Sequence, residues 1–238
     1  MNDLLRKQYL HSMGIPLWRL RHAAVPTASD LLTSENISDS NAHSSAENSS
    51  SECDLLWQHL QKDVASCTAC GLCKTRTQTV LGVGHRNAKL LIIGEAPGAQ
   101  EDRQGLPFVG RAGQLLESML LSIGLDRQQV YIANILKCRP PNNRDPERSE
   151  VDTCTPFLKR QLSLIQPRLI VALGRIAAHF LLNTTTPMNR LRQQQYTYGE
   201  NKIPLLVTFH PAYLLRSPLE KSKAYDDLLL IKELLTKI

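Results

Sequence analysis

The chain has 238 residues, of which 42% are hydrophobic, so it can bury one sizeable core in one domain or at most two. No stretch approaches the roughly 18 apolar residues of a membrane span, and residues 1–18 lack the apolar run of a secretory signal. The formal net charge is +6, but residues 1–22 carry +3 and residues 23–61 carry −6, which leaves +9 on residues 62–238. A basic globule suits a phosphate-rich partner such as nucleic acid, although a merely soluble basic surface has the same charge.

The N-terminal quarter of the chain divides into two predicted segments. Residues 1–28 form a basic arm, which is either a short helix that docks on the domain or on a protein partner, or a frayed terminus. Residues 29–55 are predicted to be a disordered linker, because residues 29–51 hold nine serines and few apolar side chains. Residues 56–238 are then left as the functional domain.

From Trp57 onward, short apolar runs alternate with amphipathic stretches. The runs predict strands at residues 89–93, 130–135, 169–173 and 205–209. The stretches predict helices at residues 112–123, at 145–165 with a kink at Pro156, at 175–182 and at 225–235. This alternation predicts an α/β fold with three layers, α/β/α, around a central, mostly parallel, four-stranded sheet.

Polar residues stand at or just after the ends of these predicted strands. They are Glu95, Asn134 and His210. In open α/β folds, ligands bind beyond the carboxyl ends of the strands, so these side chains are candidates for one site. Glycines in the nearby turns, including Gly94 and Gly98, let backbone N–H groups approach a phosphate, although such spacing is weak evidence by itself.

The six cysteines of an expected cytoplasmic protein indicate thiols or metal ligands more than disulfides. Four of them form a set that folding would have to bring together: Cys67, Cys70, Cys138 and Cys154. Four thiolates suit a tetrahedral zinc ion or a [4Fe-4S] cluster, and their spacing does not distinguish the two. Cys73 extends the first pair into C-x-x-C-x-x-C, and Cys53 lies in the linker and is expected to be free.

A series of motifs occurs in a fixed order along the domain. They are Gly94-Glu95-Ala96-Pro97-Gly98, Glu101-Asp102, GLPFVGRAG at residues 105–113, YIAN at 131–134, KCRPP at 137–141 with Asn143-Arg144, and HPAYLLR at 210–216. Together they resemble the iron-sulfur (family 4) uracil-DNA glycosylases. The resemblance runs from about Cys67 to the C-terminus and leaves residues 1–60 largely outside.

The resemblance implies an enzyme that hydrolyses the N-glycosidic bond of deoxyuridine in DNA, releases uracil and leaves an abasic site. It also implies a [4Fe-4S] cluster on the four cysteines of the set, with Cys73 as a neighbour. Phe108 would stack on the extruded base, Asn134 would read N3–H and O4 of uracil, and His210 would donate to O2 as the base departs. Without the resemblance, these three would be an ordinary core Phe, a capping Asn and a structural His.

The resemblance implies less defined roles for the other site residues. Glu95 would contact the base through its backbone or order its loop, and Glu101 would position the hydrolytic water or steady the sugar cation. Gly94 and Gly98 would border the base. Ala96 stands where related glycosylases have a water-activating Asp, so stabilisation of the leaving group and cation should carry more of the rate.

The implied partner is uracil-containing DNA, single- or double-stranded. Four arginines would contact its phosphates, with a solvated basic face as the alternative: Arg111, Arg139, Arg144 and Arg216. We further expect a monomer in the cytoplasm, associated with the nucleoid, with the basic arm as a candidate binding segment for a protein partner. Two other functions stay open here. One is a catalytically weak DNA-binding or polymerase-associated accessory protein, and the other is a zinc-stabilised nucleotide hydrolase, disfavoured by the absence of a P-loop motif.

Overall fold

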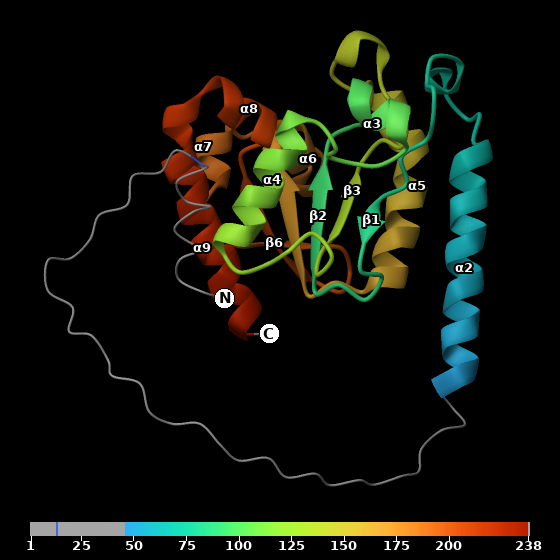
Figure 1. Cartoon of the computed structure of the whole chain (residues 1–238), viewed down its shortest axis with the longest axis horizontal. Helices are drawn as coiled ribbons and strands as arrows, with labels where there is room; N and C mark the ends of the chain where they lie inside the picture. Colours follow the sequence, from blue (N-terminus) through green and yellow to red (C-terminus); the bar gives the residue numbers. More distant parts are fainter. Residues whose placement is uncertain (1–12, 14–45, 238) are drawn as a thin grey trace, which may run out of the picture.

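A computed structural model describes Met13 and residues 46–237 of the chain (Figure 1). Its sheet has six strands in the order β1-β3-β2-β4-β6-β5. The four central strands are parallel, and each edge strand is antiparallel to its neighbour. The strands are β1 (Val83–Gly84), β2 (Leu90–Gly94), β3 (Tyr131–Asn134), β4 (Leu169–Leu173), β5 (Tyr196–Tyr198) and β6 (Ile203–Thr208).

The predicted parallel four-stranded centre is confirmed, and the strand count is corrected to six. The two edge strands escape prediction because neither is an apolar run. β1 has only two residues, and β5 is a Tyr-Thr-Tyr segment whose middle side chain is exposed. Edge strands have one neighbour and need not be buried on both faces, so they lack the signal that marks a central parallel strand.

Helices cover both faces of the sheet, as expected for three layers (Figure 1). Alternate residues of each central strand belong to two apolar clusters, which are the cores of the two interfaces. Side chains of α2, α5 and α6 complete the first cluster, and side chains of α4, α8 and α9 complete the second. The helices are α2 (Ala46–Ser66), α3 (Ala99–Gln104), α4 (Arg111–Ser122), α5 (Arg148–Ile165), α6 (Gly174–Leu182), α7 (Met188–Leu191), α8 (Pro211–Arg216) and α9 (Lys221–Lys237), with 3-10 turns η1 (Gly71–Lys74), η2 (Pro141–Asn143) and η3 (Pro218–Glu220).

The predicted linker boundary at residue 55 is corrected, because α2 begins at Ala46 and therefore includes residues 46–55. Trp57, Leu60 and Val64 share one helix face, and their burial in the first cluster explains why a helix forms here. The rest of the linker and the arm lie outside the described residues, except Met13. That side chain is fully buried in the second cluster.

Helix α5 begins three residues later than predicted. Glu147 and Glu150 form a capping box, in which each carboxylate accepts the backbone N–H of the other, so the helix begins at Arg148. It continues through Pro156, which is exposed, as one helix. Within residues 46–237, none of the helices has the length and hydropathy that a membrane span requires.

The strand order places a topological switch point beside β2. The chain leaves β2 for β3 on one side, and the next central strand, β4, adds on the other side. At such points the loops after neighbouring strands separate in opposite directions and leave a crevice for a ligand. Gly94 and Asn134 end β2 and β3 as register partners, so the residues after both strands meet at this crevice.

Candidate active site

A cavity of about 680 Å³ opens at the carboxyl ends of the central strands. It brings together eight residues that the sequence predicted for the site: Glu95, Gly98, Glu101, Phe108, Asn134, Arg144, His210 and Arg216. These residues come from the ends of β2 and β3, the segment after β6, helices α3 and α8, and two loops. The predicted convergence of Phe108, Asn134 and His210 on one cavity is therefore present in the structure.

Asn134 presents a buried amide to this cavity. The residue is 2% exposed, and its Oδ1 has no hydrogen-bond partner among the described residues. Gly94, its neighbour on β2, leaves room for this oxygen, because a Cβ at Gly94 would lie 2.3 Å from Oδ1 and 2.8 Å from Cζ of Phe108. A buried acceptor without a partner is costly, so its position indicates a ligand N–H that completes the bond.

Phe108 is held by its backbone, not only by side-chain packing. Its φ of 52° is unusual for a non-glycine residue, and such strain persists only where the surroundings enforce it. Arg127 Nη1 donates to the Phe108 carbonyl at 2.8 Å, and Nη2 donates to the Pro107 carbonyl. Gly113 allows close packing, because a Cβ there would lie 1.8 Å from the Phe108 carbonyl oxygen.

Glu101 accepts hydrogen bonds from the backbone of the same loop. Its Oε1 accepts the backbone N–H groups of Val109 and Gly110 at 3.0 and 3.2 Å. Its Oε2 lies against Gly98, where a Cβ would approach it to 2.7 Å. Glu101 therefore fastens the Phe108 loop to α3, which is a positioning role that the sequence did not suggest.

His210 caps helix α8, and this contact defines its tautomer. Its Nδ1 accepts the backbone N–H of Ala212 at 3.1 Å. The pKa of His210 is lowered to about 4, mainly because the imidazole is buried. The positive charge of Arg216 also lowers this pKa, and the negative charge of Glu101 raises it by less. The imidazole is therefore neutral near pH 7, with its proton on Nε2. Its ring centroid lies 5.6 Å from that of Phe108.

Glu95 follows β2 and has an unusual acidity. Burial raises the pKa of its carboxyl to about 7, repulsion from the Asp145 carboxylate adds to the rise, and Arg175 opposes it. Arg175 and Asp145 form an exposed ion pair of 2.8 Å, and both line the cavity. A carboxyl that titrates near neutrality in a cavity is a common feature of active sites.

Glu95→Gln is expected to change how stability depends on pH. Because the folded-state pKa lies above the unfolded value, Glu95 favours folding most at low pH, and this contribution is lost as the pH rises through 7. The glutamine variant does not ionise, so it should gain stability relative to the wild type between about pH 5 and about pH 8. Urea unfolding of both proteins across this range measures the difference. A difference that stays constant with pH would contradict the assigned acidity.

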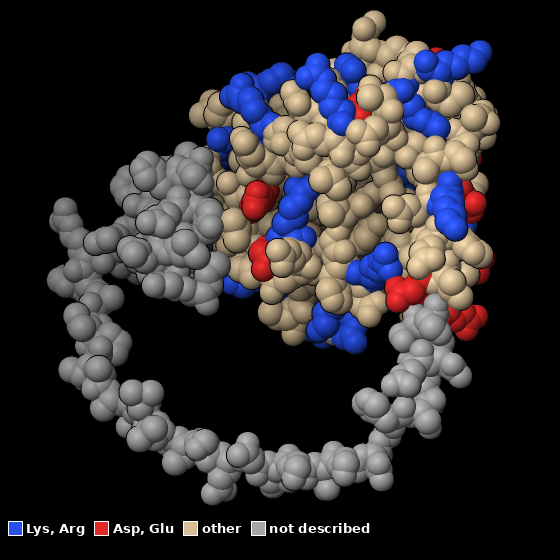
Figure 2. Space-filling model, turned by 45° about the vertical axis from the view of Figure 1, so that its right-hand side comes forward, with Lys and Arg blue, Asp and Glu red and all other residues tan. Residues whose placement is uncertain are grey.

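The four predicted phosphate-binding arginines do not share one environment. Arg144 and Arg216 line the cavity, whereas Arg111 and Arg139 do not. Arg111 is exposed at the first position of α4, and Arg139 donates through Nε to Asn143 Oδ1 at 2.8 Å. Arg144 contacts Glu150 at 2.6 Å and Glu147 at 3.2 Å, so two carboxylates already balance its charge. Lys and Arg side chains also gather on the upper part of the molecule in Figure 2, the end toward which β2 points in Figure 1.

The cysteines predicted as ligands meet at a second, smaller cavity. Cys67, Cys70, Cys138 and Cys154 all line it, and so does Cys73. Arg76 Nη1 donates to Cys138 Sγ at 3.1 Å, and the backbone N–H of Lys137 donates to Cys154 Sγ at 3.3 Å. In the described part of the chain, no three His, Cys, Asp or Glu side chains are arranged to hold a single metal ion.

Known proteins share this sequence over most of the domain. A family model described as the uracil DNA glycosylase superfamily matches residues 81–230. The chain belongs to the uracil-DNA glycosylase superfamily. A Type-4 uracil-DNA glycosylase of Archaeoglobus fulgidus is 45% identical over 182 residues, which are 74% of this chain and 92% of the relative. Proteins of the same name from Sulfurisphaera tokodaii and Thermotoga maritima are 41% and 42% identical, over 74% and 68% of this chain and 84% of each relative.

The family predicted from the motifs is therefore confirmed. Sequence reasoning nevertheless missed residues of this glycosylase-superfamily site, including Gly174 and Arg175 after β4. Gly174 has a φ of +86°, and a Cβ there would lie 2.8 Å from Cβ of His210, so it lets α6 begin beside the imidazole. The strand-end rule that identified Glu95 and Asn134 could also have found these two, because they directly follow a predicted strand.

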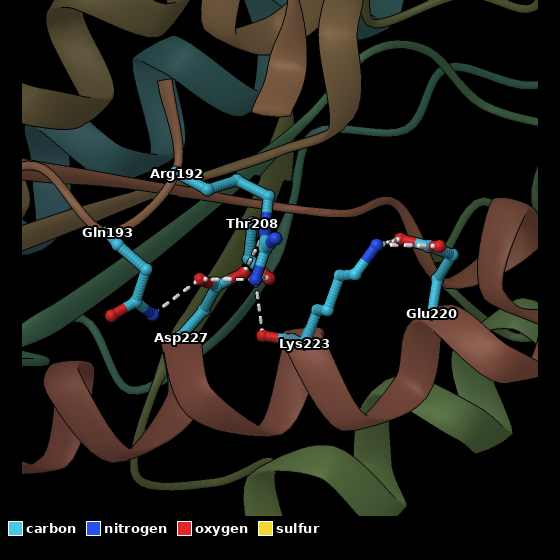
Figure 3. Close-up of polar contacts among 6 residues, drawn as sticks. All are labelled: Arg192, Gln193, Thr208, Glu220, Lys223 and Asp227. Atoms are coloured by element: carbon cyan, nitrogen blue, oxygen red, sulfur yellow. Dashed lines mark hydrogen bonds and ion pairs between the residues drawn. The ribbon is translucent and has the colours of Figure 1, made fainter. Parts of the chain in front are cut away.

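A buried ion pair beside the end of β6 was also missed (Figure 3). Arg192, after α7, forms two hydrogen bonds of 2.7 and 2.9 Å with Asp227 of α9, and their side chains are 8% and 3% exposed. Thr208, at the end of β6, and Gln193 also donate to this carboxylate, at 2.7 and 2.8 Å. The Arg192 guanidinium lies 4.5 Å from the ring centroid of Phe209. The ion pair therefore contacts both Thr208 and Phe209, the two residues that precede His210.

Proposed function

We propose that this protein is a monofunctional uracil-DNA glycosylase, which hydrolyses the N-glycosidic bond of deoxyuridine in DNA and releases uracil in base excision repair. The observation that carries the proposal is the cavity shared by Phe108, Asn134 and His210, in which a buried Asn134 oxygen lacks a partner among the described residues. The relatives named Type-4 uracil-DNA glycosylases support it.

Recognition begins when the target nucleotide leaves the DNA stack and enters the cavity. The ring of Phe108 gives the base an apolar face, and such stacking contributes roughly 1–3 kcal/mol per base. Asn134 Oδ1 accepts N3–H of uracil, and the amide N–H donates to O4. Cytosine has an acceptor at position 3 and a donor at position 4, so it would leave buried groups unpaired.

Bond cleavage transfers the electron pair of the C1′–N1 bond to the base, which departs as an anion. Water adds its oxygen to C1′, and the proton that this water loses passes to solvent or to the uracil anion. His210 has its proton on Nε2, because Nδ1 accepts the Ala212 N–H. The neutral imidazole is thus a preset donor for the negative charge that develops on uracil O2. Ala96 supplies no base for the water. Glu95 and Glu101 both line the cavity, so either carboxylate would stabilise the sugar cation, the role that the resemblance implied for Glu101.

His210→Ala is expected to lower kcat by about 10²–10³, because a preset donor to the transition state is lost. The affinity for DNA should change little, since His210 acts on the departing base more than on the phosphates. Single-turnover excision and binding of a uracil-free strand measure the two quantities. Because His210 stays neutral, a step in the wild-type rate near pH 7 should come from Glu95 and should persist in His210→Ala. Equal kcat values in variant and wild type would remove this role.

Incubating the protein with a uracil-containing oligonucleotide tests the proposed activity. Alkali should cleave the strand at the former uracil after incubation, and a matched strand with thymine should remain intact. Single- and double-stranded substrates are compared in parallel. Uracil strands that survive alkali after incubation would contradict the proposal and favour the alternative of an accessory DNA-binding protein.

We also propose that Cys67, Cys70, Cys138 and Cys154 hold a [4Fe-4S] cluster. These thiols line one cavity, and N–H donors from Arg76 and Lys137 reach two of the sulfurs, which suits an anionic cluster. A cluster bonds each thiolate to a different iron, so its ligands stand farther apart than those of one zinc ion. When bound, it would join the segment before β1 to α5 and thereby stabilise the domain.

Cys154→Ser and Cys73→Ser are expected to distinguish a cysteine that binds the cluster, Cys154, from one that only lies near it, Cys73. Wild type and Cys73→Ser should purify brown, with iron and sulfide in equal amounts, whereas Cys154→Ser should lose colour and iron and melt at a lower temperature. Metal analysis and thermal unfolding measure these properties. A colourless wild type that contains zinc would contradict the cluster.

The remaining proposals concern partners and location. Uracil-containing DNA would contact Arg111, Arg139, Arg144 and Arg216. Arg216 is best placed, because it lines the cavity and forms no ion pair with a carboxylate among the described residues. An enzyme that repairs chromosomal DNA would work in the cytoplasm on the nucleoid. We further propose that it acts as a monomer. The basic arm, residues 1–28, would bind a protein partner, which affinity capture with and without residues 1–55 would test.

A further inference from the structure

Lys137 is a fully buried lysine between the cysteine cavity and the base-binding cavity. Its side chain is 1% exposed, and Nζ donates to the Asn134 carbonyl oxygen and to Gln161 Oε1, both at 2.6 Å. Its backbone N–H donates to Cys154 Sγ at 3.3 Å. Burying an ammonium group is costly unless it is well paired, so such a residue calls for a reason beyond packing.

Helix α5 holds Lys137 at two points. Cys154 and Gln161 are seven residues apart, two helical turns, and therefore lie on the same face of α5. The first contacts the Lys137 backbone, and the second contacts its side chain. Lys137 is thus hydrogen-bonded to α5 both through its backbone and through the end of its side chain.

The same network also reaches the start of β3. Gln161 Nε2 donates to the Leu81 carbonyl at 2.8 Å and lies 3.2 Å from the Tyr131 hydroxyl. Tyr131 opens β3 and Asn134 ends it, so α5 contacts the start of this strand directly and its end through Lys137. The three residues that Gln161 contacts, Leu81, Tyr131 and Lys137, are buried or half-buried.

We propose that Lys137 and Gln161 are positioning residues that hold the end of β3 against the cysteine-bearing helix and thereby set the orientation of the Asn134 amide. The inference rests on the proposed uracil excision. Asn134 Oδ1 has no partner of its own among the described residues, so no hydrogen bond to that oxygen fixes the amide, and the placement of its backbone acts on it directly. A reading group works only if neighbouring residues hold it within a fraction of an ångström of its productive position.

A double-mutant cycle tests this coupling. Lys137→Met keeps a long apolar side chain but removes the donors to Asn134 and Gln161. We expect the single-turnover rate on a uracil strand to fall about 10-fold when Asn134 is present, and less than about 2-fold in an Asn134→Ala background. Equal factors in both backgrounds would overturn the proposal while leaving uracil excision by the wild type intact.

A second pair of variants keeps the test valid if Lys137→Met does not fold. Gln161→Met removes the acceptor for Nζ and should show the same dependence on Asn134. Gln161→Glu keeps the acceptor for Nζ but loses the donor to the Leu81 carbonyl, so it should recover only part of the rate that Gln161→Met loses. If the loss in Gln161→Met is the same with and without Asn134, the Lys137 contact is not what positions Asn134.

Hydrogen exchange supplies a readout that does not depend on activity. The N–H groups of Ile135 and Leu136 donate to the carbonyls of Gly94 and Glu95 at 3.0 and 3.1 Å, directly after Asn134. Gln161→Met should speed exchange of these two amides, whereas Lys159→Met, which changes an exposed lysine of the same helix, should alter neither exchange nor rate. Unchanged exchange in Gln161→Met would count against the proposal.

Discussion

Asn134→Asp should reduce the preference for uracil over cytosine from about 10⁴ or more toward parity. The two side chains have the same shape, so the space beside Gly94 stays filled. An ionised Asp has no donor for uracil O4, and its charge faces that oxygen. A protonated Asp instead donates to N3 of cytosine while its other oxygen accepts the N4 amine. The variant therefore loses rate on uracil and gains rate on cytosine.

Parallel excision assays on two strands that differ only in uracil or cytosine measure this ratio. Asn201→Asp provides a matched control, because Asn201 is exposed and outside the cavity, and it should keep the wild-type preference. If Asn134→Asp were as selective as the control, Asn134 would not be the group that reads the base.

Asp227→Ala should lower the free energy of unfolding by about 3–5 kcal/mol. The change leaves the Arg192 guanidinium, 8% exposed, without its counter-charge, and it removes the acceptor of Thr208 and Gln193 as well. For a domain of this size, that loss corresponds to a fall in Tm of about 6–20 °C. Calorimetry or urea unfolding measures it.

Another ion pair on the same helix provides the control. Lys237 and Glu233 of α9 lie 2.6 Å apart, about as close as Arg192 and Asp227 at 2.7 Å, but their side chains are 63% and 57% exposed. Solvent weakens such a pair, so Glu233→Ala should cost less than about 1 kcal/mol. Similar losses in the two variants would mean that burial of the Arg192–Asp227 pair does not determine its strength.

The sequence by itself determined the central sheet, the family and the position of several site residues. Each central parallel strand is a short run buried on both faces, so its apolar character is visible locally, and Glu95, Asn134 and His210 were found by their position after such runs. The motifs around these residues then indicated the family, which the comparisons confirmed. All of these signals lie within segments of a few residues.

Only the tertiary structure decided which atoms meet. The buried oxygen of Asn134, the fastening of the Phe108 loop by Glu101 and Arg127, and the α2 helix in the expected linker were not evident from the sequence. The Arg192–Asp227 pair joins residues 35 positions apart, and the contact of Lys137 with Gln161 spans 24. Such pairs leave no periodic trace in the sequence, because they depend on how separate elements pack against one another.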